Sequence, residues 1–445
     1  MGTFVGKPLK QALLWLLSGG AVLAADLPAP IAEADYTPVN MAEVTLGRDL
    51  FYDPILSGNR NTSCASCHHP RFGTSDGLSL GLGEGAVGLG PERHITETNV
   101  PEQRIPRNAP AIFNLGAKEF KVLFHDGRIE ADPSRPSGLR TPMEEEMVTG
   151  FASILSAQTM FPVLSPDEMA GHYNENEISK AVREGFITGP EGAWARISAR
   201  VAGIPAYQAA FAKAYPEIAA GRPIAFTDIS NAIAQFVAFE WRSDDSPFDA
   251  VLRKKALFQP EAAKGADLFY GSAGCSTCHS GPLLTDHSFH AMGEPQLGPG
   301  KAERFERHSR DEGRYRVTNN PADIFAFRTP SLRNVAQTGP WGHAGSHKDL
   351  ASFVADHARG GEQLARYDRA EAVLPALPKT KPDWKILDNP EEVAAIKAAA
   401  VAPVALTPDQ VAQIVAFLNT LSDPVALKGR LGVPDAVPSG LAVDH

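Results

Sequence analysis

The stretch "NTSCASCHHP" at 61–70 contains the pattern Cys-x-x-Cys-His, and "SAGCSTCHSG" at 272–281 contains it again. The two copies use all four cysteines of the 445-residue chain. Each copy places two thiols and an adjacent imidazole at the same spacing: Cys64, Cys67 and His68 in the first, Cys275, Cys278 and His279 in the second. Any function of the cysteines must therefore be explained by this five-residue motif.

Three kinds of chemistry use closely spaced cysteines. A disulfide across a two-residue gap is reactive, but it does not need a histidine directly after the second cysteine. Zinc is also bound by Cys and His. Two copies of Cys-x-x-Cys-His are, however, the attachment pattern of c-type haem, in which the thiols add to the haem vinyl groups. The pattern predicts two covalently bound haems, with His68 and His279 as the proximal iron ligands.

The N-terminus is typical of a secretory signal peptide. Lys7 and Lys10 precede the apolar run "ALLWLLSGGAVLA" at 12–24, and small residues follow. Because this run is too short for a stable transmembrane helix, we expect residues 1–25 to be removed on export to the periplasm, with an uncleaved anchor as the alternative. No other segment is apolar enough to span a membrane after cleavage.

The composition is that of a globular protein with two or three domains, because 43% of the residues are apolar and 21% are charged. The formal net charge is −10, and loss of the signal peptide with its two lysines makes the chain more acidic. We therefore expect no nucleic-acid partner.

The sequence around the haem motifs is repeated. "LGRDLFYDPILSGNRNTSCASCH" at 46–68 parallels "KGADLFYGSAGCSTCH" at 264–279, with a glycine and an apolar pair before each pentapeptide. A helix that ends shortly before a haem loop is the entry to a cytochrome c-like domain. The polar turn signal "RSDDSPFDAV" at 242–251 lies between the copies. We predict an N-terminal haem domain at 26–245 and a C-terminal haem domain at 246–445.

Helical periodicity is frequent and strand signals are weak. Residues 191–219 have a helical pattern that is broken at Pro205, and 228–241 form an amphipathic segment with Asp228 as a possible N-cap. A capping box precedes the apolar stripe of 407–421. We predict a mainly α protein built from two cytochrome c-like haem domains with long irregular loops.

The two haem motifs are accompanied by "FHDGR" at 124–128, "PSLRN" at 330–334 and "GPWGHAGS" at 339–346. In this order the motifs resemble those of the bacterial dihaem cytochrome c peroxidases and MauG, the dihaem enzyme that matures methylamine dehydrogenase. The resemblance covers roughly residues 40–425. It implies that the first haem reacts with peroxide and that the second transfers electrons.

The resemblance also implies a catalytic pocket beside the first haem. The family spacing Gln-x3-Pro-x5-Glu-Met matches Gln158, Pro162 and Glu168. A carboxylate above the iron can move the proton that cleavage of peroxide requires, glutamine can orient peroxide, and proline limits the space. Glu168 alternatively suits a helix N-terminus after Pro166. Because the loop 71–88 contains neither His nor Met, we expect an open first haem.

At the second haem the family places the distal ligand fourteen residues after the histidine of "GPWGHAGS", as Met in peroxidases and Tyr in MauG. That position is His357 here. The resemblance thus implies a bis-His haem with His279, whose low potential favours sharing of oxidising equivalents between the irons in a bis-Fe(IV)-like state. His347 and Met292 are alternative ligands.

One departure from the family and one match to it concern the region between the two haem domains. His125 of "FHDGR" replaces the family's tryptophan, and because imidazole is harder to oxidise than indole, Trp341 is an alternative charge relay. The family's calcium ion is held by an Asn side chain and by backbone oxygens of Thr and Pro. The matching residues are Asn108, Thr338 and Pro340, which offer the oxygen ligands that calcium prefers.

Together these features predict an exported dihaem c-type peroxidase or related oxidoreductase. We expect it to react with hydrogen peroxide at the first haem and to share oxidising equivalents with the second to oxidise a substrate. The reductant would be a small cytochrome or a cupredoxin, or an unidentified substrate. One alternative is a cytochrome c peroxidase that removes peroxide with electrons from a small cytochrome. The other is a dihaem electron-transfer cytochrome.

Overall fold

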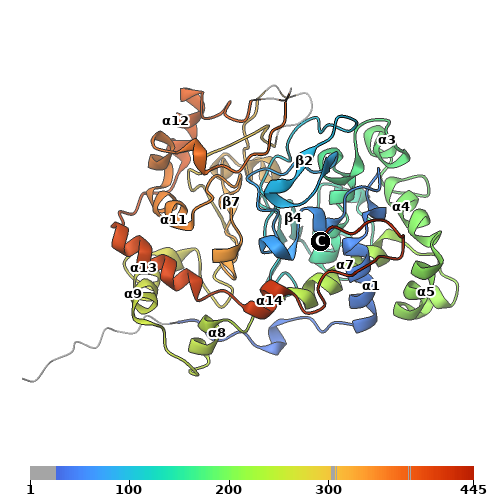
Figure 1. The fold of residues 1–445 in the computed structure, drawn as a ribbon, viewed down its shortest axis with the longest axis horizontal. Helices are drawn as coiled ribbons and strands as arrows, with labels where there is room; N and C mark the ends of the chain where they lie inside the picture. The colour runs from blue at the N-terminus through green and yellow to red at the C-terminus, as the bar shows by residue number, and fades with distance from the viewer. Residues whose placement is uncertain (1–26, 302–305, 307, 379, 381) are drawn as a thin grey trace, which may run out of the picture.

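The computed structural model describes residues 27–301, 306, 308–378, 380 and 382–445, so the predicted signal peptide lies outside the described residues. Helices dominate and the strands are short, which confirms the predicted mainly α fold. In Figure 1 the helices α3, α4, α5 and α7 of the first half lie to the right, and α9, α11, α12 and α13 of the second half lie to the left. No helix in the described part is both long and apolar enough to cross a membrane.

The α-helices are α1 (Met41–Tyr52), α2 (Ile154–Thr159), α3 (Glu177–Glu184), α4 (Ala193–Ala202), α5 (Pro205–Ala214), α6 (Pro216–Ala219), α7 (Phe226–Glu240), α8 (Pro247–Leu252), α9 (Pro260–Tyr270), α10 (Tyr315–Thr318), α11 (Leu350–Arg359), α12 (Pro390–Ala399), α13 (Pro408–Asn419) and α14 (Pro424–Lys428). The strands are β1 (Ala86–Val87), β2 (His94–Ile95), β3 (Val122–Leu123), β4 (Ile129–Ala131), β5 (Leu139–Arg140), β6 (Phe289–His290) and β7 (Phe327–Arg328). They form antiparallel sheets in the orders β1-β2, β3-β4-β5 and β6-β7.

Two equivalent helix crossings underlie the sequence repeat. Helix α1 packs on α7, and α9 packs on α13. A Cβ atom on Gly47 would lie 1.9 Å from the carbonyl oxygen of Ala232, and one on Gly265 would lie 1.9 Å from that of Gln413. Only a residue without a side chain allows backbones to approach so closely. The glycine before each haem motif therefore serves the same helix packing in both halves.

Replacing Gly265 with alanine is expected to destabilise the protein by about 1–3 kcal/mol, because the new methyl group would force α9 away from α13. Thermal unfolding followed by circular dichroism would show this as a lower midpoint. Lys264→Ala, at an exposed position of the same helix, is the matched control and should change stability by less than about 0.5 kcal/mol. Equal midpoints for the two variants would contradict the close crossing.

The predicted helix ends agree with the structure except at one position. The N–H of Gln410 donates to Thr407 Oγ1 (3.3 Å) and the N–H of Thr407 donates to Gln410 Oε1 (2.8 Å), so the capping box of α13 is confirmed. The break at Pro205 is also confirmed, since α5 begins there. Asp228 as an N-cap is wrong: α7 begins earlier, after Ala225, and the Asp228 carboxylate accepts the N–H of Ala225 from within the first turn.

The segment that follows "FHDGR" contains β4 and β5. Their hairpin is fastened by Glu130 of β4, which pairs with Arg140 of β5 and with Arg314 (2.7 Å) from the second half of the chain. Figure 1 shows β4 near the middle of the molecule. Through the ion pair between Glu130 and Arg314, this hairpin connects the two halves of the chain.

Two large buried clusters form the cores. The first described residue contacts the second cluster, and residues near the end of the sequence belong to the first. The first cluster includes residues of α1 and α7, and the second includes residues of α9 and α13. Leu27 packs against the second cluster, whereas Ala426 and Val437 belong to the first. Figure 1 shows the last segment running from α14 back towards α1 and α7. The boundary at 245/246 stays a prediction, and the last residues of the chain contribute to the first core.

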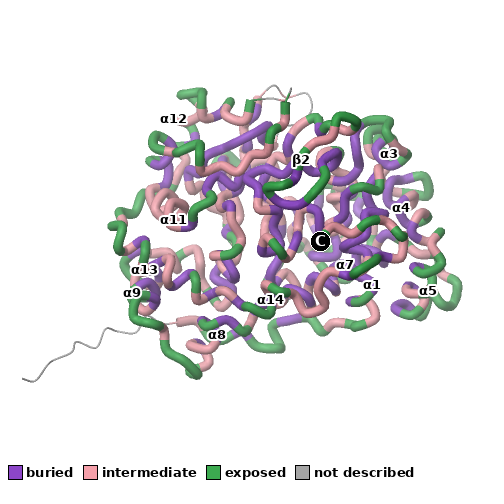
Figure 2. The backbone as a smooth tube through the Cα atoms, in the orientation of Figure 1, coloured by how far each residue is buried: buried purple, intermediate pink, exposed green. Residues whose placement is uncertain are grey.

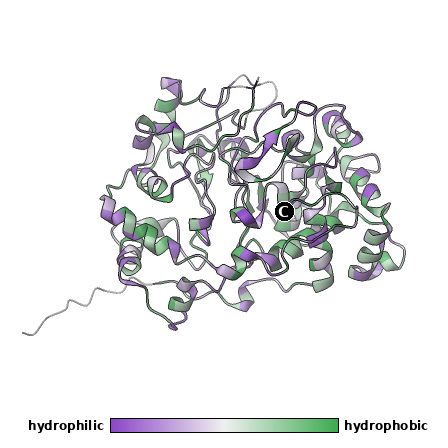
Figure 3. Ribbon diagram, in the orientation of Figure 1, coloured by the Kyte–Doolittle hydropathy of each residue, from purple (hydrophilic) through white to green (hydrophobic). Residues whose placement is uncertain are grey.

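The distribution of buried and of hydrophobic residues agrees with a core in the middle of the molecule. Much of α12 and of the turns around α3 and α5 is exposed in Figure 2, and buried backbone is concentrated in the middle of the molecule. Helices α9 and α13 each carry both hydrophobic and hydrophilic residues in Figure 3. Val411, Ile414 and Leu418 of α13 are buried, as the predicted apolar stripe requires.

Candidate dihaem site

The first Cys-x-x-Cys-His motif is a tight turn that directs a neutral histidine. Cys64–Ser66 form a 3-10 turn, and the N–H of His68 donates to the Cys64 carbonyl (2.9 Å). The ring Nδ1 of His68 lies 3.0 Å from the carbonyl oxygen of Thr74, where only a protonated nitrogen makes a hydrogen bond. Burial lowers the pKa of His68. The neutral ring therefore keeps Nε2 for a metal, as a haem ligand requires.

The second motif repeats this geometry. Cys275–Thr277 form a 3-10 turn, and Nδ1 of His279 lies 3.1 Å from the carbonyl oxygen of Leu284. Burial, with a contribution from His357, lowers the pKa of His279 to about 4. None of the four cysteines forms a disulfide. Free thiol pairs, each beside an oriented neutral imidazole, fit two covalently attached haems.

The three predicted catalytic residues come from consecutive short elements. Gln158 lies in α2, Pro162 begins a 3-10 turn (Pro162–Leu164), and Glu168 lies in a π-helix (Pro166–Ala170). The N–H of Glu168 donates to Ser165 Oγ (3.3 Å) at the start of this π-helix, so the position also suits an acid in a first helical turn. Single π-turns are rare and occur often at functional sites, and no sequence signal indicated this one.

Burial is the largest cause of a raised pKa at Glu168, and the neighbouring Asp167 adds to it, whereas Lys301 and Arg128 lower it. A carboxyl group whose pKa is raised exchanges a proton more readily near neutral pH, which is what acid–base catalysis needs. Burial also raises the pKa of the Cys67 thiol to about 12, and the Glu168 carboxylate contributes to that rise. Glu168 thus lies within electrostatic range of the first haem motif.

The loop 71–88 supports the π-helix. The N–H of Glu84 donates to the carbonyl oxygen of Asp167 (3.0 Å), and a Cβ on Gly83 would lie 1.9 Å from the same oxygen. Gly83 also has a positive φ of 59°, which favours glycine. The loop 71–88, which contains neither His nor Met, therefore holds the segment that carries Glu168.

Two histidines face each other at the second motif. The ring centroids of His279 and His357 are 6.4 Å apart. Two metal–imidazole bonds of about 2 Å, plus about 1 Å from each nitrogen to its ring centre, give roughly 6 Å for two imidazoles on opposite sides of one iron. The Nδ1 atom of His357 lies 2.8 Å from Glu294 Oε1, so its Nε2 is the nitrogen left for a metal. The spacing suits a haem between the two rings.

The alternative ligands are less well placed. Both ring nitrogens of His347 have protein partners, with Nδ1 2.8 Å from Ser346 Oγ and Nε2 3.1 Å from Asp356 Oδ2. Met292 lies in the loop beside Gly360, past the end of α11. The geometry therefore favours His357 over both.

His125 joins the two halves of the chain. Its Nε2 lies 3.1 Å from the carbonyl oxygen of Asn108, and its own carbonyl accepts the N–H of Arg328 (2.7 Å). Burial and the neighbouring Arg107 lower the pKa of His125 to about 3, so the ring is neutral. The neutral ring suits a hydrogen-bonding role between the halves, and its part in charge transfer stays a prediction.

Trp341 lies on the side of the second haem motif. Its Nε1–H donates to the carbonyl oxygen of Val335 (2.9 Å), and its ring lies 6.4 Å from Phe353, which is 5.2 Å from His357. This row of rings leads from Trp341 towards His357, the predicted ligand of the second haem. Trp341 as a relay also stays a prediction.

The predicted calcium ligands come from two neighbouring segments. The N–H of Asn108 donates to the carbonyl oxygen of His343 (2.9 Å), and its Nδ2 donates to that of Leu78 (2.7 Å). Thr338 lies against the loop of the first motif, where a Cβ on Gly73 would be 3.2 Å from its Cγ2. Pro340 follows a cis peptide bond. Oxygen atoms suited to calcium are present, and the shared site stays a prediction.

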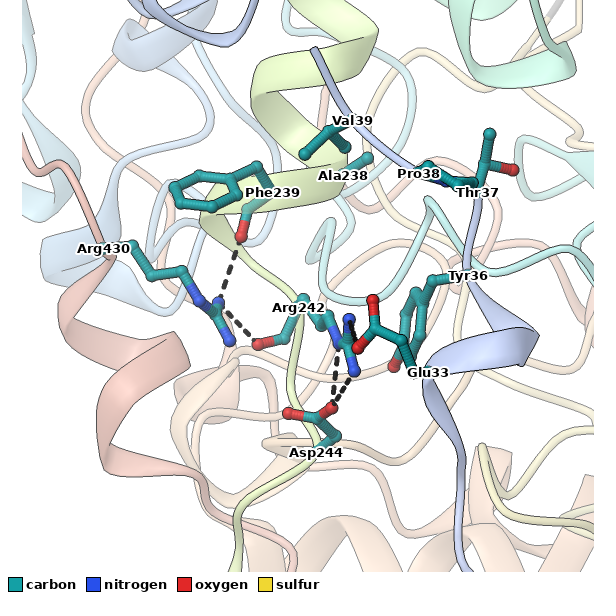
Figure 4. A pocket seen from close by; sticks show the side chains of 10 residues that line it. All are labelled: Glu33, Tyr36, Thr37, Pro38, Val39, Ala238, Phe239, Arg242, Asp244 and Arg430. Carbon is teal, nitrogen blue, oxygen red and sulfur yellow. Dashed lines mark hydrogen bonds and ion pairs between the residues drawn. The ribbon is translucent and has the colours of Figure 1, made fainter. Parts of the chain in front are cut away.

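A surface pocket of about 240 Å³ lies away from the haem motifs, between the segment 33–39 and α7 (Figure 4). Arg242 pairs there with Glu33 (2.7 Å) and Asp244 (2.6 Å) and lies over the ring of Tyr36. Arg430 donates to backbone carbonyls of α7 and of Arg242. These charges are paired with one another. The ion pairs and hydrogen bonds of Arg242 and Arg430 therefore attach the segments around Glu33 and Arg430 to the C-terminal end of α7.

The fold and the paired motifs define a dihaem c-type oxidoreductase, and comparison with known proteins agrees. The sequence model of the di-haem cytochrome c peroxidase family matches residues 41–257. Cytochrome c551 peroxidase of Pseudomonas aeruginosa is 30% identical over 81% of this chain and 85% of its own length. The methylamine utilization protein MauG of Methylorubrum extorquens is 29% identical over 76% of this chain and 74% of its own.

Among solved structures, a MauG-like protein associated with microbial copper homeostasis has a TM-score of 0.57 and 25% identity, covering 94% of this chain and 97% of that one. The chain belongs to the di-haem cytochrome c peroxidase family, and it is a haem-dependent enzyme with two haems.

Proposed function

We propose that the protein reacts with hydrogen peroxide at its first haem and shares the oxidising equivalents with a bis-His second haem to oxidise a substrate. The observation that carries the proposal is the 6.4 Å separation of the His279 and His357 rings. A second imidazole gives a haem a lower potential than a thioether ligand does. Such a site is a poor electron reservoir for a mild donor and is more easily oxidised beyond its resting state.

At the first haem, the chain's own residues would handle the proton. The haem, when bound, supplies the iron that takes up peroxide and the oxidising equivalents. Glu168 would accept a proton from the nearer peroxide oxygen and return it to the departing one, as its raised pKa supports. Gln158 would orient peroxide by hydrogen bonds, and Pro162 would limit the space beside the open position. His68 would bind the iron of this haem.

Several finer features belong to this proposal. The signal-like N-terminus supports export to the periplasm, and the polar turn before α8 supports division into haem domains at 26–245 and 246–445. One calcium ion would lie at Asn108, Thr338 and Pro340. The reductant would be a small cytochrome, a cupredoxin or a substrate molecule. The alternative, removal of peroxide with electrons from a small cytochrome, is favoured by the likeness to cytochrome c551 peroxidase.

Low-temperature EPR of the diferric protein tests the proposal. We expect one high-spin signal and one bis-imidazole low-spin signal, and both should decrease after one equivalent of peroxide without a comparable organic radical. Loss of the high-spin signal alone, with rapid turnover of a reduced small cytochrome, would favour the alternative. Two low-spin signals that peroxide leaves unchanged would contradict a peroxide-reactive first haem.

A further inference from the structure

We infer that Glu294 is a positioning residue for the second haem: its buried carboxylate holds His357 and lowers the reduction potential of that site. This inference rests on the proposed function, because it takes His357 as the distal ligand. No spacing in the sequence indicates it, since Glu294 precedes His357 by 63 residues. The contact between these two side chains is visible only in the fold.

The hydrogen bond itself is well defined. Nδ1 of His357 lies 2.8 Å from Glu294 Oε1, so the ring donates its Nδ1–H to the carboxylate. Glu294 is only 8% exposed, and its Oε2 is buried without a hydrogen-bond partner among the described residues. A buried carboxylate with a single partner needs nearby positive charge. The iron that His357 would bind supplies that charge.

Residues on both sides of Glu294 hold this segment in place. Gly293 has a positive φ of 69°, and a Cβ there would lie 2.5 Å from the N atom of Gly361, just beyond α11. Gln296 donates through Nε2 to the carbonyl oxygen of Asp311 (2.8 Å) and accepts the N–H of the same residue (2.9 Å). The carboxylate is therefore held against the last turn of α11, where His357 lies.

The expected effect follows from charge. A carboxylate that accepts the Nδ1–H of a metal-bound histidine makes the ring a stronger donor to the metal and fixes its orientation. The oxidised iron carries more positive charge than the reduced one, so a nearby buried negative charge favours the oxidised form. His68 and His279 donate instead to neutral backbone carbonyls. The three histidines thus differ, and only His357 has a carboxylate partner.

Glu294→Gln tests the inference, because glutamine keeps an oxygen acceptor and removes the charge. We expect the variant to retain a bis-imidazole EPR signal with altered g values, and the equilibrium constant for reduction of the second haem to rise about tenfold, or about 59 mV, in spectroelectrochemical titration. The oxidised state formed with peroxide should also decay faster. Glu294→Asp should restore part of the wild-type potential.

Glu362→Gln is the matched control. It removes the same charge shortly after α11, but Glu362 is exposed and pairs with Lys397. Equal shifts in Glu294→Gln and Glu362→Gln, or no shift in either, would overturn the inference and leave the proposed function intact. A wild-type protein without a bis-imidazole signal would instead overturn the proposed function.

Discussion

Glu168→Gln is expected to slow the reaction with hydrogen peroxide by about 10²–10⁴-fold, the usual contribution of a positioned acid–base group. The amide keeps the size of the side chain but cannot accept and return the proton. Stopped-flow absorbance of the Soret band after mixing with peroxide would give the rate constant. Both haem spectra should remain those of the wild type, because Glu168 binds neither iron in the proposed arrangement.

Asp167→Asn is the matched control for this prediction. Asp167 is the preceding residue of the same π-helix, and its side chain accepts a hydrogen bond from Gln103 (2.8 Å). Its replacement removes one charge from the segment and should change the peroxide rate less than about tenfold. Equal rates for wild type and Glu168→Gln would remove Glu168 from the mechanism and would leave it as an acid in a helical turn.

His357→Met is expected to raise the potential of the second haem on the order of 0.1 V, within the ~0.8 V range that axial ligands span. A thioether stabilises the reduced iron relative to an imidazole. The bis-imidazole EPR signal should be replaced by one with different g values. The oxidised state formed with peroxide should become shorter-lived, and turnover with a small reduced cytochrome should increase. Redox titration and EPR of the same samples would measure these changes.

His347→Gln provides the comparison, because His347 is the other histidine near α11 and both of its ring nitrogens already have partners. This variant should keep the wild-type spectrum of the second haem. An unchanged spectrum in His357→Met together with an altered one in His347→Gln would reassign the distal ligand to His347.

Much of the architecture could be predicted because it depends on local sequence signals. The haem motifs, the capping box before α13 and the break at Pro205 each need only a few adjacent residues. The start of α7 was missed because an aspartate near a helix start can be either the N-cap or a residue of the first turn. Asp228 is in the first turn, and its carboxylate accepts the N–H of Ala225.

The parts of the site that could not be predicted depend on contacts between distant segments. Glu294 meets His357 only through the fold, and the π-helix at Glu168 depends on its packing against the loop around Gly83. The spacing that selected Glu168 and His357 came from likeness to a family, and no periodicity in this chain would have found either residue. Long-range contacts of this kind leave no signal in a single sequence.

Residues 439–444 lie against the first haem motif and the helix end before it. Ser66, between the two cysteines, donates through Oγ to Asp444 Oδ2 (3.2 Å), and Ser439 donates to Asp53 Oδ1 (2.6 Å). Because synthesis runs from the N-terminus, the first motif is complete long before this tail, and its thiols would be accessible for haem attachment while their cover is still missing. Residues 439–444 are consequently expected to influence the haem that is attached farthest from them in the sequence.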